Sequence, residues 1–342
     1  MHQLKNLMLA FYKPRKMKDL LHRLYFGHYL SRAEASQVVE DITNKKYSDV
    51  QNAALLSALN MRLPSTEEML GYRDTMLKQA LNINIHHQKV IDIVGTGGDG
   101  KDTFNISTLA CLVCAGAGIK VAKHGNYSAS SVSGSSNILE AVGVVFSNDE
   151  TILNQQLNDA NITFLHAPLF HPAMKNIGAL RKEMGVKTIF NLLGPLSNPC
   201  EPTIQMIGVY SDVIGNLYKN VLLQLKSNFA VVHAIDGYDE ISLTAETRVS
   251  TKDKDIYFLP KDFGAKTIQP HEIYGGNTIE SNKTIFLNVL NGKGTEAQNN
   301  VVIANAALGI SLYTNKNLEE SLVLAKESLL GLKALACLEK LK

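Results

Sequence analysis

The spacing of apolar residues changes near residue 90, and that change divides the chain into two parts. Before residue 86, apolar residues recur three or four positions apart, which predicts amphipathic helices. Helix start signals accompany this pattern, among them Ser31 followed by Glu34 and the run at 64–67. Four helices are therefore expected, at about 19–24, 33–42, 48–59 and 64–79.

From residue 90 onward, short apolar runs alternate with helical patterns. This alternation is typical of a mostly parallel sheet covered by helices. The chain after about residue 299 again has a helical pattern. The fold class predicted is α/β, with a small helical domain and a larger domain whose mostly parallel sheet is flanked by helices. The expected strands are 90–94, 118–122, 163–166, 205–210 and 230–235.

The first predicted strand leads directly into a glycine turn, Gly95-Thr-Gly-Gly-Asp99, and then into Thr103-Phe-Asn-Ile-Ser-Thr108. Because glycine has no Cβ, the backbone N–H groups of such a turn can approach a phosphate closely. Asn105, Ser107 and Thr108 open the next helix, whose N-terminal dipole favours an anion. The stretch predicts a phosphate-binding loop, and its spacing matches neither the dinucleotide fingerprint nor the P-loop.

A second polar loop follows the strand at 118–122. It contains Lys123-His-Gly-Asn-Tyr-Ser-Ala-Ser-Ser131 and then Gly134-Ser-Ser-Asn. In a parallel sheet, loops that follow successive strands lie at the same edge, where ligands bind in open α/β folds. The two loops are therefore expected to form one site.

Three further features each admit more than one interpretation. The turn at 236–240 contains Asp239 and Glu240, which suit Mg²⁺, although such a turn is also common in solvent. Arg181 lies in a predicted helix and could be an anion ligand or an exposed salt-bridging residue. His171 precedes Pro172 and could be a ligand, a helix cap or a surface histidine.

Composition limits the classes of function. The chain has 342 residues and a formal net charge of +2, which is too small to indicate nucleic acid or an anionic membrane as a partner. No apolar stretch reaches the length of a membrane span, and no cleavage site follows the apolar N-terminal run, so a cytoplasmic protein is expected. Cys111 and Cys114 have CxxC spacing but lie in an apolar helical stretch, which favours a core role over metal or redox chemistry.

Together, the motifs GTGGD…TFNIST, KHGN…SS…SGS, HPAMK…R and DGxDE resemble the anthranilate phosphoribosyltransferases. That family joins anthranilate to phosphoribosyl pyrophosphate in tryptophan biosynthesis. The resemblance runs from about Met17 to the C-terminus, so residues 1–16 are expected to be a short extension. It implies Mg²⁺ as cofactor, a homodimer, and two domains: 1–86 with 172–197, which is helical, and 87–171 with 198–342, which binds the sugar donor.

The resemblance also implies roles for individual residues. Gly95, His124, Asn126, His171 and Arg181 would bind anthranilate, the guanidinium pairing with the acceptor's carboxylate. Ser107, Asp239 and Glu240 would hold magnesium, and Lys123 would stabilise the leaving pyrophosphate. No residue is expected to act as a dedicated general base. The residues that would bind the sugar donor are Gly95, Gly98, Asp99, Thr103, Asn105, Ser107, Thr108, Lys123, Ser131 and Ser135.

The chain departs from the family pattern at two positions. Tyr127 follows KHGN where the family usually has Arg, and Asn137 stands where it usually has Asp. The two changes remove charges of opposite sign. We hypothesise that the usual pair support one another and were lost together, in which case residues 127 and 137 lie near one another.

Two other readings remain open. A pyrimidine-nucleoside phosphorylase shares the two-domain architecture and the glycine loop, but it would not need Asp239, Glu240 or Arg181. A non-catalytic, nucleic-acid-binding paralogue should be more basic, with its acceptor residues lost. The near-neutral charge and the complete set of motif residues favour the transferase.

Overall fold

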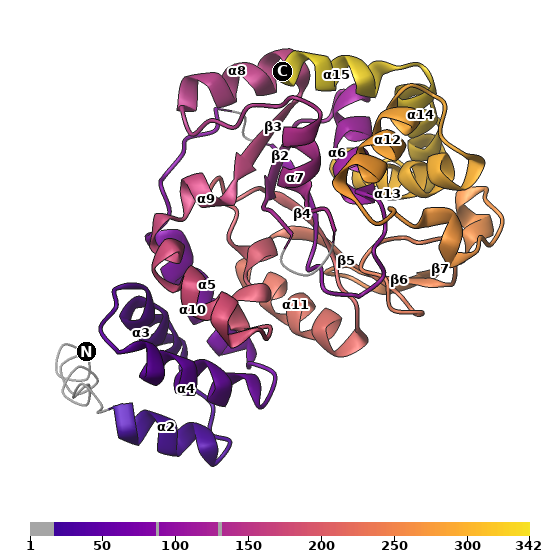
Figure 1. Ribbon diagram of the computed structural model, residues 1–342. Helices are drawn as coiled ribbons and strands as arrows, with labels where there is room; N and C mark the ends of the chain where they lie inside the picture. Colours follow the sequence, from indigo (N-terminus) through magenta and orange to yellow (C-terminus); the bar gives the residue numbers. More distant parts are fainter. Residues whose placement is uncertain (1–16, 87–88, 129–131) are drawn as a thin grey trace, which may run out of the picture. The chain divides into compact units, whose positions relative to one another are not determined.

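The structure is a computed structural model that describes residues 17–86, 89–128 and 132–342 (Figure 1). The described chain forms two compact units, residues 17–78 with 173–193 and residues 79–172 with 194–342. The expected extension at 1–16 and the expected donor residue Ser131 lie outside the described residues. Within these ranges, none of the helices has the length and hydropathy needed to cross a membrane.

The first unit is helical. Its helices are α2 (Met17–Tyr25), α3 (Arg32–Thr43), α4 (Asp49–Asn60), α5 (Thr66–Lys78) and α10 (Lys175–Met184). The start of α3 is fixed by the predicted capping box, in which Ser31 and Glu34 satisfy each other's backbone N–H groups. Asn176 of α10 donates to the carbonyl of Thr43 (2.8 Å), which attaches this late segment to the early helices. The predicted helical domain is therefore built from two separate stretches of the chain.

The second unit contains a seven-stranded sheet in the order β3-β2-β1-β4-β5-β6-β7. The first five strands are parallel, and the last two pair antiparallel at one edge. The sequence patterns did not predict these two edge strands, but the fold class predicted is confirmed. The strands are β1 (Ile91–Gly95), β2 (Val121–Gly125), β3 (Ile162–His166), β4 (Ile204–Gly208), β5 (Asn228–Ala234), β6 (Thr247–Ser250) and β7 (Asp255–Phe258).

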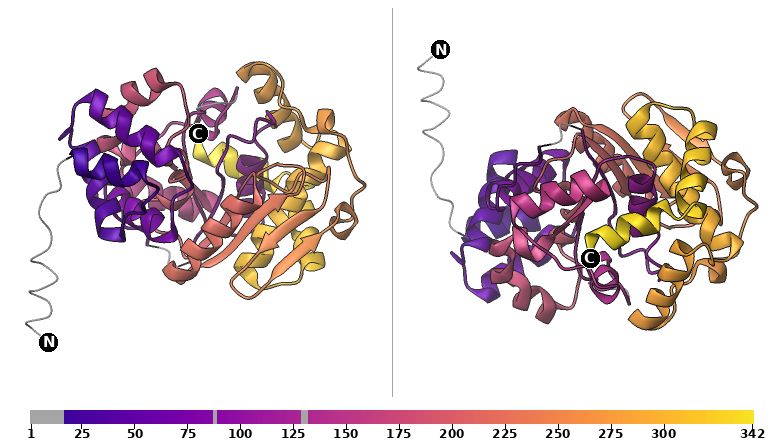
Figure 2. Two further views of the ribbon diagram at one scale, coloured as in Figure 1. Left: turned by 90° about the horizontal axis from the view of Figure 1, so that it is seen from below. Right: turned by 90° about the horizontal axis from the view of Figure 1, so that it is seen from above.

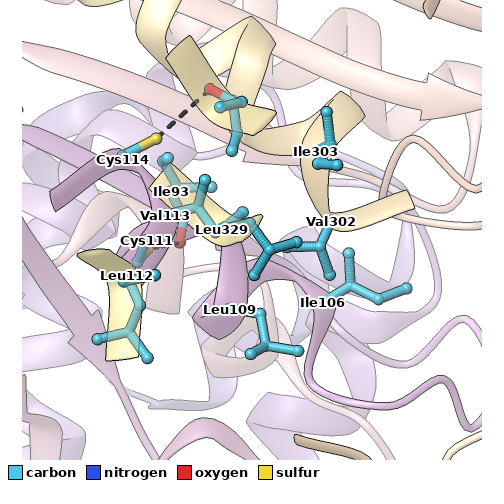
Figure 3. Packing of buried hydrophobic residues seen from close by; sticks show 14 of the residues in the cluster. Ile93, Ile106, Leu109, Cys111, Leu112, Val113, Cys114, Val302, Ile303 and Leu329 are labelled. Carbon is cyan, nitrogen blue, oxygen red and sulfur yellow. Dashed lines mark hydrogen bonds between the residues drawn. The ribbon is translucent and has the colours of Figure 1, made fainter. Parts of the chain in front are cut away.

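Helices cover the sheet of the second unit (Figure 2). Two of them, α6 (Ile106–Gly116) and α13 (Glu296–Thr314), pack against each other and against β1. Cys111 and Cys114 of α6 are fully buried in this layer, among Ile93, Val302 and Leu329 (Figure 3). Their thiols donate to the backbone carbonyls of Ile93 and Ala306, and burial raises the pKa of Cys111 to about 11. The interpretation of both cysteines as core residues is confirmed.

The remaining helices complete the unit around this core. They are α7 (Ser135–Ala141), α8 (Glu150–Ala160), the short α9 (Ala167–Phe170), α11 (Asp212–Leu225), α12 (Ile279–Leu290), α14 (Leu318–Leu330) and α15 (Lys333–Leu341). On the sheet, α11 packs against β5, and Gly215 of α11 lies directly over Val209 and Val231. Both α14 and α15 pack against α6.

Strand order reverses at β1, because β2 and β3 extend to one side of it and β4 lies on the other. Ligands in doubly wound folds bind outside the carboxyl ends of the strands at such a point. Here Gly95 and Gly208, which end β1 and β4, are directly paired. A Cβ on Gly208 would overlap the carbonyl of Asp239, and a Cβ on Gly95 would overlap its carboxylate. The turn after β5 therefore lies directly on these two strand ends.

This close contact predicts the effect of adding one methyl group. Gly208→Ala should displace the Asp239 turn and lower the free energy of unfolding by ~1–3 kcal/mol, the usual cost of overpacking. Gly178→Ala is the matched control, because Gly178 lies in α10 with open space around its Cβ position. Urea denaturation measures both variants, and a Gly208 variant as stable as the control would contradict the close contact.

Candidate active site

The glycine loop follows β1 at the point where strand order reverses. Gly97, Gly98 and Gly100 have φ of +65°, +76° and +72°, values that only glycine adopts readily. The loop is tied at its start, where Thr96 donates its backbone N–H to the carbonyl of Gly208 (2.9 Å). It is tied again at Thr103, which pairs with Tyr274. The loop is therefore held at both ends by pairing with other segments of the unit.

The acidic turn binds the amides of this loop. Asp239 Oδ2 accepts from the backbone N–H of Gly97 (2.7 Å), and Glu240 Oε1 accepts from the N–H of Ser107 at the start of α6 (3.0 Å). Glu240 Oε2 also accepts from the Thr103 hydroxyl (3.3 Å). Asp239 is only 8% exposed, so the alternative of an acidic turn in solvent is wrong. The carboxylates lie at the donors that a phosphate would use in a glycine loop.

Asp99, Asp239 and Glu240 bring three carboxyl groups together. Burial and then the charge of Asp99 raise the pKa of Asp239 to about 7, and a hydrogen bond joins these two side chains. Burial, followed by the charges of Asp239 and Asp99, raises the pKa of Glu240 well above its usual range. Ionising all three groups is unfavourable unless a cation compensates.

The oxygen atoms of these side chains fit Mg²⁺ as ligands. Carboxylates and the Ser107 hydroxyl are hard oxygen ligands, and Mg²⁺ commonly binds through one or two carboxylates together with substrate phosphates. In the part of the chain that the structure describes, no group of three or more His, Cys, Asp or Glu side chains is placed so that it could hold a metal ion by itself.

The second polar loop is joined to the first through Asn105. Its Nδ2 donates to the carbonyl of Ser133 (3.1 Å), and the Ser133 hydroxyl donates back to its Oδ1 (3.1 Å). Ser135 Oγ donates to the Asn126 carbonyl (3.4 Å). The structure thus brings the two predicted loops together. Ser133 was not among the predicted residues, although the serine-rich stretch around it is a signal in the sequence.

Asn137 closes the second loop. Its Oδ1 accepts from the backbone N–H groups of Ser128 and Gly134, both at 3.0 Å. The peptide between Tyr127 and Ser128 therefore contacts Asn137, as the hypothesis of a paired loss requires. The Tyr127 hydroxyl donates to Glu140 (3.4 Å), and its ring lies edge-on to His166. In this chain an aromatic contact and a neutral amide hold the loop.

Two histidines of the predicted acceptor site lie side by side, with ring centroids 5.3 Å apart. His171 is buried, and its Nε2 lies 2.9 Å from the Ser197 carbonyl, so the reading of His171 as a surface residue is wrong. His124 Nδ1 lies 3.2 Å from the Gly194 carbonyl, which makes Nδ1 the protonated nitrogen. Its Nε2 is buried and has no partner among the described residues.

Lys123 and Thr108 are deeply buried. The Lys123 amine donates to the carbonyl of Ile93 (2.6 Å), and its charge partly offsets the burial that raises the pKa of Asp92 to about 6. The hydroxyls of Thr108 and of Thr96 are buried and, among the described residues, have no hydrogen-bond partner. Unsatisfied buried hydroxyls beside a glycine loop are suited to a polar ligand. Thr96 was not predicted, although it lies inside the GTGGD motif.

Arg181 lies in α10, in the helical unit, whereas the other predicted acceptor residues lie in the α/β unit. It is half-buried, its guanidinium lies over the ring of Phe190, and it donates to Asn191 Oδ1 (3.2 Å). Burial lowers its pKa, and no described carboxylate pairs with it. The alternative of an exposed salt-bridging residue is therefore wrong.

Comparison with known families agrees with this architecture. Residues 87–334 match the a/b domain of the glycosyl transferase family, and residues 18–80 match the helical bundle domain of the same family. The chain belongs to the glycosyl transferase family, whose members combine these two domains.

Relatives narrow the assignment to the anthranilate phosphoribosyltransferases. The protein of that name from Flavobacterium johnsoniae is 48% identical over 326 residues, covering 95% of this chain and 99% of the relative. The one from Bacteroides thetaiotaomicron is 47% identical over 325 residues, with 95% and 98% covered. The resemblance seen in the motifs is confirmed.

Solved structures show the same fold. Anthranilate phosphoribosyltransferase from Thermus thermophilus superposes with a TM-score of 0.86 at 34% identity, covering 93% of this chain and 97% of that one. The Saccharomyces cerevisiae enzyme in complex with PRPP and Mg has a TM-score of 0.86 at 26% identity, with 95% and 96% covered. The same yeast enzyme in complex with 4-fluoroanthranilate has a TM-score of 0.83 at 25% identity, again with 95% and 96% covered.

The environment of His124 predicts a pH effect on stability. Burial and the charge of His171 lower the pKa of His124 to about 3, so the folded ring stays neutral while the unfolded ring binds a proton below about 6.5. Stability from this group is complete above pH 6.5 and falls as the pH drops, by ~2 kcal/mol between pH 7 and pH 5. In urea unfolding, the His124→Gln variant should lose this contribution to the pH dependence of stability. The exposed His271→Gln is the control, and a His124 variant with the wild-type dependence would contradict the buried neutral ring.

Proposed function

We propose that this chain transfers the phosphoribosyl group of phosphoribosyl pyrophosphate to the amine of anthranilate, forming N-(5-phosphoribosyl)anthranilate and pyrophosphate in tryptophan biosynthesis. The observation that carries the proposal is the group of carboxylates, buried at Asp239 and half-buried at Asp99 and Glu240, on the glycine loop at the strand-order reversal. It combines phosphate donors with magnesium ligands in one place. Relatives of that name, close to half identical over nearly the whole chain, support the choice of substrates.

The donor's pyrophosphate would bind the glycine loop. Its oxygens would accept hydrogen bonds from the backbone N–H groups of Gly97 and Ser107. In the structure, the carboxylates of Asp239 and Glu240 accept those hydrogen bonds. The free hydroxyls of Thr96 and Thr108 are further donors. Other residues assigned to the donor site are Gly95, Gly98, Asp99, Thr103, Asn105, Lys123 and Ser135.

Ser107, Asp239 and Glu240 would hold Mg²⁺ on the pyrophosphate. A bound magnesium ion neutralises charge that develops on the leaving group. The Asp239 and Glu240 carboxylates would have to leave the backbone amides to reach the metal. The same movement frees those amides for phosphate oxygens, so metal and donor are expected to bind together.

Gly95, His124, Asn126, His171 and Arg181 would bind anthranilate. The guanidinium of Arg181, which pairs with no described carboxylate, suits the carboxylate of the acceptor. The Nε2 lone pair of His124 suits an N–H of the anthranilate amine. Arg181 belongs to the helical unit, and the other four residues belong to the α/β unit.

The reaction forms a bond from the anthranilate nitrogen to C1 of the ribose and breaks the bond from C1 to the pyrophosphate oxygen. The pair of electrons of the broken bond leaves with pyrophosphate, and the proton that the amine loses goes to the released pyrophosphate or to water. An aniline nitrogen is nucleophilic when neutral, so positioning the two substrates supplies much of the rate enhancement, up to ~7–11 kcal/mol. Lys123 lies on β2 with its amine on the Ile93 carbonyl of β1 (2.6 Å) and would add positive charge there.

We further propose a homodimer formed through the helical unit and a cytoplasmic location, where free phosphoribosyl pyrophosphate is available. The helical unit exposes large apolar side chains beside and within α2 and α4, which pack against each other: Phe26 is 70% exposed, Val50 80% and Met61 84%. Light scattering should give twice the chain mass of 37.5 kDa, and the single mass would contradict the dimer.

The reaction itself is tested by loss of anthranilate fluorescence. Purified protein should consume anthranilate only when phosphoribosyl pyrophosphate and Mg²⁺ are both present. Product identity is checked by mass spectrometry. Folded protein that leaves anthranilate unchanged under these conditions would contradict the proposed activity.

Arg181 should matter for one substrate only. Arg181→Ala should raise the KM for anthranilate at least tenfold, because a charge-assisted hydrogen bond contributes ~1.5–3 kcal/mol. The KM for phosphoribosyl pyrophosphate should change little. The control is Lys182→Ala, the exposed neighbour on the same helix. Equal increases in both KM values would assign Arg181 a structural role.

The acidic turn offers its own matched pair of variants. Glu240→Gln should raise the Mg²⁺ concentration that gives half-maximal rate about tenfold, because the metal loses a charged ligand. Asp236→Asn removes the same charge from the exposed part of the turn, where Asp236 accepts a hydrogen bond from Thr244. This variant should leave the Mg²⁺ concentration for half-maximal rate unchanged. An unchanged magnesium dependence in the Glu240 variant would dismiss its metal role.

A further inference from the structure

A single polar side chain lies in the most apolar part of α13. Asn305 is 2% exposed and stands between Ala304 and Ala306 in a stretch, 301–310, that is otherwise apolar. A buried amide is costly unless its donors and acceptor are satisfied. Its partners therefore indicate why an asparagine occupies this position.

Asn305 pairs with both backbone groups of one residue. Its Oδ1 accepts from the N–H of Ile241 (3.0 Å), and its Nδ2 donates to the carbonyl of Ile241 (2.8 Å). The second proton of Nδ2 is directed to the Val301 carbonyl, one turn earlier in α13 (2.8 Å). The amide therefore fixes the Ile241 backbone at two points and is itself held by the helix.

Ile241 immediately follows Asp239 and Glu240. These residues belong to a turn between β5 and β6, so no strand or helix of their own fixes their height above the sheet. Their carboxylates contact the glycine loop on one side, and Asn305 holds the backbone on the other. When the carboxylates leave the amides of the loop, Asn305 still holds the end of the turn, while the Ala234 N–H, bonded to the Tyr238 carbonyl (3.1 Å), holds its beginning.

We infer that Asn305 is a positioning residue for the magnesium ligands Asp239 and Glu240. This inference rests on the proposed function, because it assigns Asn305 to the metal site of that reaction. Removing its amide leaves the N–H and carbonyl of Ile241 buried and unpaired, and the turn must shift to satisfy them. The ligands would remain in the sequence but would no longer meet the ion in one geometry.

Metal binding, measured without turnover, tests this inference. The probe is Mn²⁺ with inorganic pyrophosphate, and electron paramagnetic resonance of free Mn²⁺ gives the dissociation constant. Asn305→Leu, of similar size, should weaken Mn²⁺ binding at least tenfold, as is usual when the support of a metal ligand is lost. Asn305→Asp keeps the acceptor for the Ile241 N–H, but its second carboxyl oxygen faces the Ile241 and Val301 carbonyls in place of the donor, so it should also weaken Mn²⁺ binding.

Ser328→Ala is the control. Ser328 is fully buried on α14 and donates to the Val113 carbonyl of α6 (2.6 Å), so its loss removes a buried hydrogen bond from the same helical layer, away from the acidic turn. It should bind Mn²⁺ as the wild type does. In steady-state kinetics, the Asn305 variants should show a raised Mg²⁺ requirement and an unchanged KM for anthranilate.

The outcomes separate the inference from the function on which it rests. Wild-type protein that binds no Mn²⁺ in the presence of pyrophosphate would contradict the proposed metal site itself. Wild-type binding with no loss in either Asn305 variant would overturn the role of Asn305, and so would an equal loss in Ser328→Ala. If Asn305→Leu fails to fold, Asn305→Asp decides: unchanged Mn²⁺ binding overturns the inference, and weakened binding supports it.

Discussion

The structure of the site depends on one steric constraint, the contact between the Asp239 turn and the ends of β1 and β4. Gly95 and Gly208 end those strands, and any larger residue at either position would occupy space that Asp239 fills. The absence of two methyl groups lets the acidic turn that follows β5 reach the glycine loop that follows β1, two strands away in the sheet. The proposed magnesium ligands and phosphate donors, far apart in the sequence, thereby lie together.

That proximity has an electrostatic consequence. Three carboxyl groups lie together, and backbone N–H groups and the hydrogen bond between Asp99 and Asp239 partly satisfy them. The same N–H groups are the natural partners of a pyrophosphate. Under the proposed function, the protein's own carboxylates occupy the anion site, and a divalent cation that draws them away would also prepare the loop for the donor. Asn305 would keep the turn in place during this exchange.

Local features of the sequence predict much of the fold and part of the site. The capping box at Ser31, the glycine loop at the end of β1 and the helix that follows it could be predicted because neighbouring residues encode them. The edge strands β6 and β7 were missed, since β6 has no apolar run and no residue of β7 is buried. The hydrogen bond from Ser107 to Glu240 joins residues 133 positions apart and has no local signal. Asn305 was visible only as a polar residue in an apolar helix.

Calorimetric titration of inorganic pyrophosphate into the protein, with and without Mg²⁺, tests the central claim most directly. If the carboxylates of Asp239 and Glu240 occupy the phosphate site until a metal draws them away, pyrophosphate should bind measurably only when Mg²⁺ is present. Binding of pyrophosphate with the same affinity in the absence of Mg²⁺ would contradict this account of the site.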